Sequence, residues 1–292
     1  MTTIRLSAAD VDIVVPEGLS QEMLENFSPL NRWLTRLTKS LAQQHTNPSH
    51  PFRAEPYALR QVTIQSFDLF GGKRVGFLKL QADVRNARDE SLPGAIFLRG
   101  PSVAMLVLLV PDDVEAGSAR EAEERRVVLT VQPRIPAGSL GFVELPAGMV
   151  DNGTFAGAAA KEIEEELGLV IEESELTNLS DLVAGAQGSD AQPQQQQRSG
   201  GSSVDVDEDL PEAVYPSAGG CDEFIPVFVH ERRVARESLD EWTGKLTGLR
   251  DDGERITLKL IKMKDLWKEG RRDAKCLAAV ALWEGLKREG KL

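Results

Sequence analysis

Apolar residues recur at helical spacing over residues 20–44, where leucine or phenylalanine stands at positions 24, 27, 30, 34, 37 and 41. This spacing predicts an amphipathic helix. The next apolar stretches are VTIQSFDLF and RVGFLKLQADV, and the dipeptide Gly71-Gly72 stands between them. Strand-forming residues on both sides of two glycines predict two strands joined by a turn.

Four later segments predict strands because they are short and rich in apolar residues: 102–110, 127–131, 223–229 and 255–263. The acidic and basic segment between the first two predicts a charged loop. Residues 273–289 predict a final helix. The segment from residue 60 to 131 is β-rich and does not alternate strand and helix as parallel βαβ units do.

Residues 154–167 predict a second prominent helix. Thr154 is suited to cap its N-terminus, the interior is rich in alanine, and Gly168 stands where a helix commonly stops. One apolar stripe follows the spacing of four residues along it, and this stripe is expected to face the core. Its members are Phe155, Ala159, Ile163 and Leu167.

Residues 187–212 have the composition of a disordered surface insertion. They are rich in glutamine, serine and glycine, carry six acidic residues and one arginine, and contain almost nothing to bury. Such a segment is expected to remain without a packed core and to have no catalytic role.

The composition excludes several classes of protein. The 292 residues suffice for one large domain or two modest ones, and 34 Lys and Arg against 46 Asp and Glu leave a charge of −12, which disfavours nucleic-acid binding. The longest apolar run, residues 103–110, is too short to cross a membrane. The two cysteines, Cys221 and Cys276, favour a reducing compartment, and we expect the cytoplasm, with an organelle as the alternative.

Three glutamates gather on the helix at 154–167. Glu162 and Glu166 are four residues apart and share one face, with Glu165 beside them. Their mutual repulsion destabilises the helix unless a cation lies among them, and carboxylate oxygens are natural ligands of Mg²⁺ or Mn²⁺. Taken alone, this pattern is more typical of a solvated acidic face. The flanking sequence decides between the two interpretations.

The segment from Glu144 to Leu169 resembles the Nudix box, G-x5-E-x7-R-E-U-x-E-E-x-G-U with U apolar. Its second half is matched by Lys161, Glu162, Ile163, Glu165, Glu166, Gly168 and Leu169, with lysine in place of arginine. Gly148 matches the opening glycine. Twelve residues separate Gly148 from Lys161 where the pattern has thirteen, and Thr154 stands near the position of the first glutamate.

Further motifs outside the box are similar to those of the ADP-sugar pyrophosphatase branch of the Nudix hydrolases, notably its plant-like members. They occur in the order GFLKLQADV, FLRGPSVAML, VQPRIPAG, ELPAGMVD, YPSAGGCDE, KLTGLRDDGE and DLW…DAK. The resemblance covers about three-quarters of the chain. It implies a Nudix α/β/α sandwich with a mixed sheet at residues 96–292, preceded by a smaller β-rich region at 1–95 that builds a homodimer.

The resemblance also implies a metal site and a general base. Glu162, Glu165, Glu166 and the carbonyl of Ala147 would hold Mg²⁺, with Mn²⁺ as an alternative, and Glu165 is thereby also counted as catalytic. The ions would neutralise the diphosphate and lower the pKa of the attacking water, so no serine, cysteine or histidine nucleophile is needed. Glu223 would act as the general base. Asp222 is the fallback.

Several residues are candidates for binding the substrate. Arg134 of the Q-x-R motif suits a phosphate, although a surface arginine beside a strand has the same sequence pattern. Arg99 is a second candidate, Arg250 a weaker one, and Gly148 is expected to lie against the substrate. The choice of a residue to stack on adenine stays open among Trp33, Phe97 and Phe142.

The function that this resemblance implies is Mg²⁺-dependent hydrolysis of an ADP-sugar, ADP-glucose or ADP-ribose, to AMP and the sugar phosphate. A UDP- or GDP-sugar pyrophosphatase is one alternative, since the metal chemistry is indifferent to the base. A Nudix-fold module that binds a nucleotide without hydrolysing it is another, and Lys161 and the shortened box are the features in its favour.

Overall fold

The computed structural model describes residues 2–6, 9–150, 154–185, 208–248 and 255–292. The chain forms two compact units, each assembled from separate stretches of sequence. Unit 1 comprises residues 1–100, 189–211 and 217–223, and unit 2 comprises residues 101–188, 212–216 and 224–292. Each unit has its own hydrophobic core and is described by itself.

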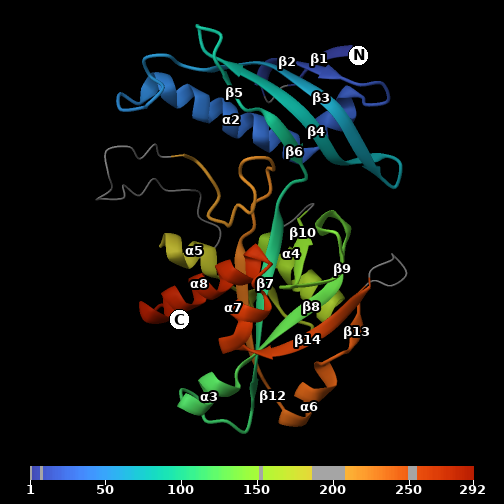
Figure 1. Ribbon diagram of the computed structural model, residues 1–292, viewed down its shortest axis with the longest axis vertical. Coiled ribbons are helices and arrows are strands. Elements are labelled where there is room, and N and C mark those ends of the chain that lie inside the picture. The colour runs from blue at the N-terminus through green and yellow to red at the C-terminus, as the bar shows by residue number, and fades with distance from the viewer. Residues whose placement is uncertain (1, 7–8, 151–153, 186–207, 249–254) are drawn as a thin grey trace. The chain divides into compact units, whose positions relative to one another are not determined.

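Unit 1 contains a six-stranded sheet in the order β1-β2-β3-β4-β5, with β6 also paired to β4 (Figure 1). Its strands are β1 (Thr2–Leu6), β2 (Ala9–Val15), β3 (Ala58–Phe70), β4 (Arg74–Arg85), β5 (Ser91–Leu92) and β6 (Ala95–Leu98). Strands β2 and β3 are parallel, and the other pairs are antiparallel. The predicted β3–β4 turn is confirmed, because Gly71 and Gly72 both adopt positive φ, at 58° and 71°.

The helix predicted at 20–44 is divided into α1 (Gln21–Glu25) and α2 (Ser28–Thr46). Ser20 caps α1 by accepting a hydrogen bond from the Met23 amide at 3.2 Å. The division follows from Pro29, which has no N–H to give and is favoured in the first turn of a helix. The buried leucines of α2 share a hydrophobic core with the strands of this sheet, and Figure 1 shows α2 lying along it.

Unit 2 contains a mixed sheet in the order β11-β12-β7-β8-β14-β13, with β10 paired to β7 and β9 paired to β8. Its strands are β7 (Ser102–Pro111), β8 (Arg126–Arg134), β9 (Ser139–Glu144), β10 (Ala147–Met149), β11 (Thr177–Asn178), β12 (Val227–Val234), β13 (Leu246–Thr247) and β14 (Ile256–Lys262). Strand β12 runs parallel to β7, and the other described pairs are antiparallel.

Strand β7 is buried along its whole length because helices cover both faces of the sheet. Leu106 and Leu108 pack on the side of α5, α7 and α8, whereas Met105 and Val107 pack on the side of α4 and α6. The helices are α3 (Ala119–Glu124), α4 (Phe155–Glu162), α5 (Leu179–Ala184), α6 (Arg236–Trp242), α7 (Leu266–Glu269) and α8 (Ala274–Arg288). The predicted α/β/α sandwich with a mixed sheet is therefore confirmed.

Two local predictions are wrong. The segment predicted as a charged loop contains α3, which Ser118 caps by accepting a hydrogen bond from the Glu121 amide at 3.1 Å. The strand predicted at 223–229 lies at Val227–Val234 instead. It continues through charged residues because its backbone pairs with β7 throughout and its side chains form ion pairs, such as Arg125–Glu231 at 2.7 Å.

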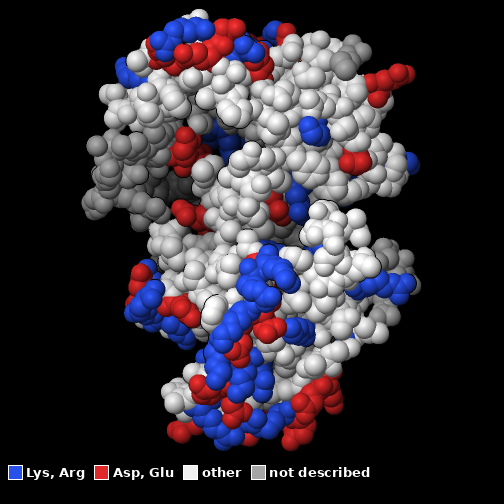
Figure 2. All heavy atoms as spheres, in the orientation of Figure 1, with Lys and Arg blue, Asp and Glu red and all other residues white. Residues whose placement is uncertain are grey.

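Charged side chains of both signs cover the surface around α3 and α6. Arg236 pairs with Asp113 at 2.8 Å, and Arg120 pairs with Glu124 at 2.6 Å. Figure 2 shows this interspersion of Lys and Arg with Asp and Glu over the region where Figure 1 places α3 and α6. Exposed pairs of this kind contribute little free energy each, so this surface is best understood as a solvated one.

The insertion predicted as disordered, 187–212, falls mainly on residues 186–207, which lie outside the described residues. Its end is described, and there Asp209 pairs with Lys39 of α2 at 3.0 Å. Within the described ranges, no helix combines the length and apolar character needed to cross a membrane.

Shortening a side chain in the buried strand should destabilise the protein. Leu108 is fully buried, and Leu108→Ala should lower the free energy of unfolding by about 2–5 kcal/mol through lost burial and a residual cavity. Leu140→Ala is the control, because Leu140 is 78% exposed. Chemical denaturation of both variants measures the difference; equal stabilities would contradict the assigned core.

Candidate active site

The helix that carries the three glutamates is fixed at both ends. The Thr154 hydroxyl accepts a hydrogen bond from the Gly157 amide at 2.9 Å, and Gly168 closes the helix at a φ of +70°. The predicted cap and stop are both confirmed. After α4, the chain continues through one wider π-helical turn, η2 (Ile163–Leu167), which contains Glu165 and Glu166. Such turns are frequent at functional sites.

The predicted apolar stripe anchors this helix to the sheet. Ala159, Ile163 and Leu167 are fully buried in the core on one face of β7. Phe155 is half-buried, and its ring centroid lies 5.8 Å from that of Phe224. Because the stripe fixes the rotation of the helix about its axis, it also fixes where the glutamates point.

Glu166 is the most strongly perturbed of these glutamates. Its side chain is buried with a residue exposure of 5%, and its Oε1 accepts a hydrogen bond from Gln132 Nε2 at 3.4 Å. Its Oε2 is buried and has no hydrogen-bond partner among the described residues. Burial, together with the charges of Glu162 and Glu144, raises the pKa of Glu166 to about 8.

Glu162 lies against the backbone of the loop that precedes the helix. Strand β10, which contains Ala147 and Gly148, pairs with β7 beside α4. A Cβ atom at Gly148 would overlap the Glu162 carboxylate. A larger residue at this position would therefore displace the Glu162 side chain, and the structure brings Gly148 and Glu162 together.

Glu165 has a different environment. Its Oε1 lies 3.1 Å from Lys161 Nζ, one turn earlier on the same helix. Lys161 occupies the position where the Nudix box has arginine, so the substituted residue pairs with a glutamate of the box. The proposed metal-binding and catalytic roles of Glu165 remain predictions.

A buried network of charges lies behind Glu166. Arg134 Nε donates to Glu144 Oε1 at 2.6 Å, and Lys275 Nζ lies 3.0 Å from the other Glu144 oxygen. Lys275 also contacts Asp273 at 2.9 Å, and Asp273 accepts a hydrogen bond from the Leu145 amide at 3.0 Å. Arg134 was predicted as a phosphate ligand; the structure places it beside Glu144, with its side chain 39% exposed.

Sequence reasoning assigned no role to four residues of this site: Gln132, Glu144, Asp273 and Lys275. All four stand in motifs that carry the family resemblance. Gln132 gave the clearest signal, because it is a polar residue in a strand whose preceding positions are mostly apolar. Glu144 and Lys275 are separated by 131 residues, and a pairing at that separation cannot be read from spacing.

Unit 1 holds the predicted general base. Glu223 Oε1 lies 3.1 Å from Arg99 Nη1. The fallback residue, Asp222, accepts hydrogen bonds from the Arg99 and Gly100 amides at 2.8 and 3.2 Å, and burial raises the pKa of its carboxyl. Since Asp222 thus holds the end of β6 in place, the geometry within this unit favours Glu223 for a chemical role.

The residues considered for adenine stacking differ in exposure. Trp33 packs against the core of unit 1, and Phe142 is half-buried on β9. Phe97 is 39% exposed, with its ring centroid 5.3 Å from that of Phe77. The choice among them stays open. Arg250, the weaker phosphate candidate, lies outside the described residues.

Comparison with known proteins identifies the family of this chain. The NUDIX domain family matches residues 113–279, more than half of the chain. The chain belongs to the Nudix family. It is 37% identical over 235 residues to "Nudix hydrolase 14, chloroplastic" from Arabidopsis thaliana. That match covers 80% of this chain and 64% of the Arabidopsis protein, less than two thirds of its length.

A solved structure described as "Crystal structure of ADP compounds hydrolase" is 15% identical to this Nudix chain, with a TM-score of 0.44. The likeness covers 80% of this chain and 99% of that one.

The carboxylates of this Nudix chain suit a hard divalent cation. No group of three or more His, Cys, Asp or Glu side chains forms a ready metal cluster within the described ranges. Glu166 nevertheless presents a buried oxygen that no donor among the described residues satisfies, and Glu162 is close enough to raise its pKa. A buried carboxylate of this kind is stabilised by a cation, and oxygen is the ligand atom that Mg²⁺ prefers.

Adding one carbon at Gly148 should disturb the site. Gly148→Ala forces the Glu162 carboxylate or β10 to move and should cost about 1–3 kcal/mol of stability. Gly141→Ala is the matched control, because its Cβ would meet only Val131 Cγ1, at 3.9 Å. Thermal unfolding distinguishes them; a Gly148→Ala variant as stable as the control would contradict the described contact.

The buried Glu166 should make the stability of metal-free protein depend on pH. Its pKa is about 8 when folded and about 4.5 when exposed, so the folded state binds more protons between these values. This contribution is fully present below about pH 4.5 and is lost as the pH rises through 8. Glu166→Gln removes this pH-dependent contribution to stability. The melting temperature of the variant minus that of wild type should therefore increase as the pH is raised from 5 to 8.

Circular dichroism after removal of metals measures this difference. Glu164→Gln is the control because Glu164 is exposed on the same helix. A difference between Glu166→Gln and wild type that does not change with pH would contradict the perturbed carboxyl.

Proposed function

We propose that this Nudix chain hydrolyses the diphosphate bridge of an ADP-sugar, such as ADP-glucose or ADP-ribose, to AMP and the sugar phosphate. Family membership supports hydrolysis of a nucleotide derivative, and the motifs that resemble the ADP-sugar pyrophosphatase branch support adenine and a sugar. The single observation that carries the proposal is Glu166 in the Nudix box, a buried carboxylate with one oxygen that has no partner in the described part of the chain.

The proposed cation is Mg²⁺, held by Glu162, Glu165, Glu166 and the Ala147 carbonyl. When bound, it would neutralise charge on the diphosphate and activate the attacking water. The raised pKa of Glu166 supports this assignment because a nearby cation stabilises the ionised carboxyl that burial disfavours. Glu165 would have to exchange its ion pair with Lys161 for the cation.

Arg134 is proposed to bind a phosphate of the substrate. Its Nε is committed to Glu144, which orients the planar guanidinium, and the side chain remains 39% exposed. A guanidinium oriented in this way presents paired N–H groups to phosphate oxygens. Lys275 and Asp273 support Glu144 from the start of α8 and are positioning residues in this proposal.

Glu223 is proposed as the general base that accepts a proton from the attacking water. Its ion pair with Arg99, at 3.1 Å, holds the carboxylate in a defined orientation. Arg99 is therefore proposed to position Glu223, in addition to the substrate-binding role predicted from the sequence. Asp222 is less suited, since it is committed to backbone amides.

The remaining expectations also stand as proposals. The N-terminal region is proposed to build a homodimer, as the resemblance implies. The cytoplasm is the expected compartment; an organelle is the alternative, and the Arabidopsis relative is named as chloroplastic.

A panel of nucleotide sugars tests the proposed activity. With Mg²⁺, we expect AMP from ADP-ribose or ADP-glucose and little product from UDP- or GDP-sugars, as measured by chromatography. Glu166→Gln should lower kcat/KM by at least about 100-fold, because one charged group at the reacting diphosphate is removed. Glu164→Gln is the matched control and should stay within about twofold, because Glu164 is exposed beside it.

Each other outcome has a distinct meaning. Release of UMP or GMP alone would overturn the assignment of adenine while retaining the hydrolase. No turnover of any nucleotide sugar by folded protein with Mg²⁺ or Mn²⁺ would favour a binding module. Equal rates for Glu166→Gln and Glu164→Gln would overturn the metal-ligand assignment.

A further inference from the structure

Unit 1 has a pocket of about 520 Å³ on the surface of α2. Three cationic side chains of this helix line it, one turn apart in succession: Arg32, Arg36 and Lys39. The opposite wall is the segment Asp209–Pro211. The pocket thus combines a basic helix face with the end of an acidic segment, all within one unit.

Arg32 is only partly satisfied by the protein. Its Nη2 atom is buried and has no hydrogen-bond partner among the described residues. The backbone at Gly100 lies close to this nitrogen: a Cβ atom added to Gly100 would be 3.6 Å from Arg32 Nη2. Asp222 attracts Arg32 through space, but its carboxylate already accepts hydrogen bonds from two backbone amides.

The cations on this helix face repel one another. Burial and the neighbouring charge of Arg36 both lower the pKa of Arg32. Like charges one turn apart destabilise a helix, and a buried donor without a partner adds a further cost. An arrangement that lowers stability in this way is typical of a site built for a ligand of opposite charge.

The acidic residues Glu208 and Asp209 show that this face of α2 attracts carboxylates. Asp209 pairs with Lys39 at 3.0 Å, and Glu208 accepts a hydrogen bond from Ser40 at 2.9 Å. Lys39 and Asp209 are 61% and 66% exposed, so their pair contributes little free energy and is readily displaced. The Asp209 carboxylate therefore binds Lys39 only weakly at the edge of the pocket.

We propose that the α2 pocket binds a small phosphate-bearing anion. Arg32 lines the pocket, and its guanidinium would turn its buried Nη2, which has no partner among the described residues, toward a phosphate oxygen, while the charges of Arg36 and Lys39 would add attraction. Arginine suits phosphate because its planar fork matches the spacing of the oxygens. Asp209 would compete with the anion for Lys39. The proposal does not require the proposed hydrolysis, because binding of an anion to this pocket is measured without turnover.

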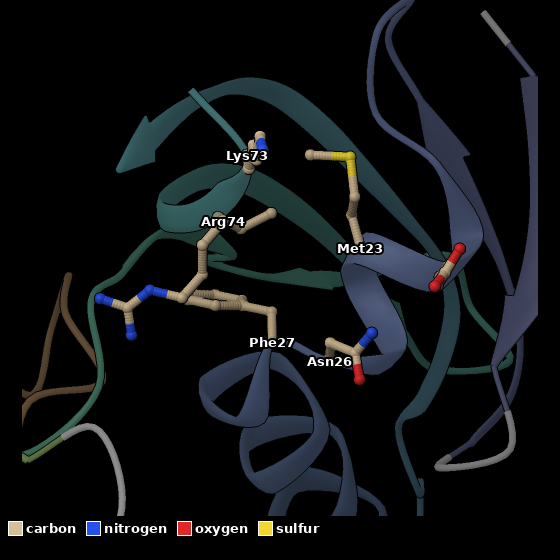
Figure 3. Close-up of a pocket in the computed structure, with 7 residues that line it drawn as sticks. Met23, Asn26, Phe27, Lys73 and Arg74 are labelled. Atoms are coloured by element: carbon tan, nitrogen blue, oxygen red, sulfur yellow. The ribbon is translucent and has the colours of Figure 1, made fainter. Parts of the chain in front are cut away.

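A second pocket of unit 1, of about 360 Å³, offers a useful contrast. Figure 3 shows Met23 and Phe27 at this pocket, together with Lys73 of the β3–β4 turn and Arg74, the first residue of β4. Its lining holds no buried donor without a partner in the described part of the chain. The α2 pocket is therefore the stronger candidate for an anion.

Calorimetric titration of metal-free protein with inorganic pyrophosphate tests the proposal. Without metal, the proposed catalytic site lacks Mg²⁺ and keeps only its arginines, so the binding that is lost in Arg32→Gln, and retained in the control variant, reports on the α2 pocket. Arg32→Gln should weaken binding at least about tenfold, the scale of one lost charge-assisted hydrogen bond. Lys79→Gln is the matched control, because it removes one exposed charge of the same unit outside the pocket.

Asp209→Asn provides the opposite change. Removing the competing carboxylate should tighten pyrophosphate binding by about two- to fivefold, the scale of an exposed ion pair. Arg32→Gln should also melt no lower than wild type without ligand, because it relieves repulsion. If Arg32→Gln fails to fold, Arg36→Gln takes its place, with the same expected loss of binding.

Three results would overturn the site: no pyrophosphate binding at millimolar concentration by wild type and Asp209→Asn, equal affinities for Arg32→Gln and Lys79→Gln, or a weaker affinity for Asp209→Asn than for wild type. Kinetics then identifies the source of the anion in nature. A raised KM for the nucleotide sugar in Arg32→Gln would mean that the pocket binds the substrate's own phosphate. An unchanged KM with lost pyrophosphate binding would mean a separate phosphorylated compound.

Discussion

The burial of one carboxylate, that of Glu166, is the constraint around which unit 2 is arranged. An ionised carboxyl away from water is costly unless a donor or a cation satisfies it. Gln132 donates a hydrogen bond to one oxygen of Glu166, and the positive charge of nearby Arg134 counteracts part of the rise in the pKa of Glu166. The apolar stripe of α4 keeps the carboxylate in this position, because the helix cannot rotate it into solvent without exposing Ile163 and Leu167. Core packing thus sustains an electrostatic strain in the Nudix box.

The charges behind this carboxylate connect distant parts of the chain. Arg134 ends β8, Glu144 ends β9, and Lys275 opens α8. Two cations around Glu144 compensate its burial, and Asp273 ties Lys275 to the backbone that leads into β10. A buried ion pair contributes little net free energy, but loss of one partner is severe because the other charge is left unpaired. The network therefore fixes geometry more than it adds stability.

The sequence predicted the parts of this molecule that rest on local pattern. The helix around Glu162, its cap, its stop and its buried stripe follow from spacing and residue type, as does the turn at Gly71. Predictions failed where long-range pairing decides: β12 extends through charged residues because β7 holds its backbone. The roles of Glu144 and Lys275 were missed for the same reason, since a contact across 131 residues leaves no trace in local periodicity. The wider turn η2 likewise has no signature in residue type.

The division of the chain bears on how this architecture can change in evolution. Unit 1 is completed by residues 217–223, which return from the second half of the sequence, and there the Gly220 carbonyl accepts a hydrogen bond from the Phe97 amide at 2.8 Å. No single crossover between two related genes can therefore exchange unit 1 intact. A recombinant made at Gly100 would pair one parent's β6 with the other parent's 217–223 segment. Inheritance of an intact unit 1 therefore requires that both stretches of sequence come from the same parent.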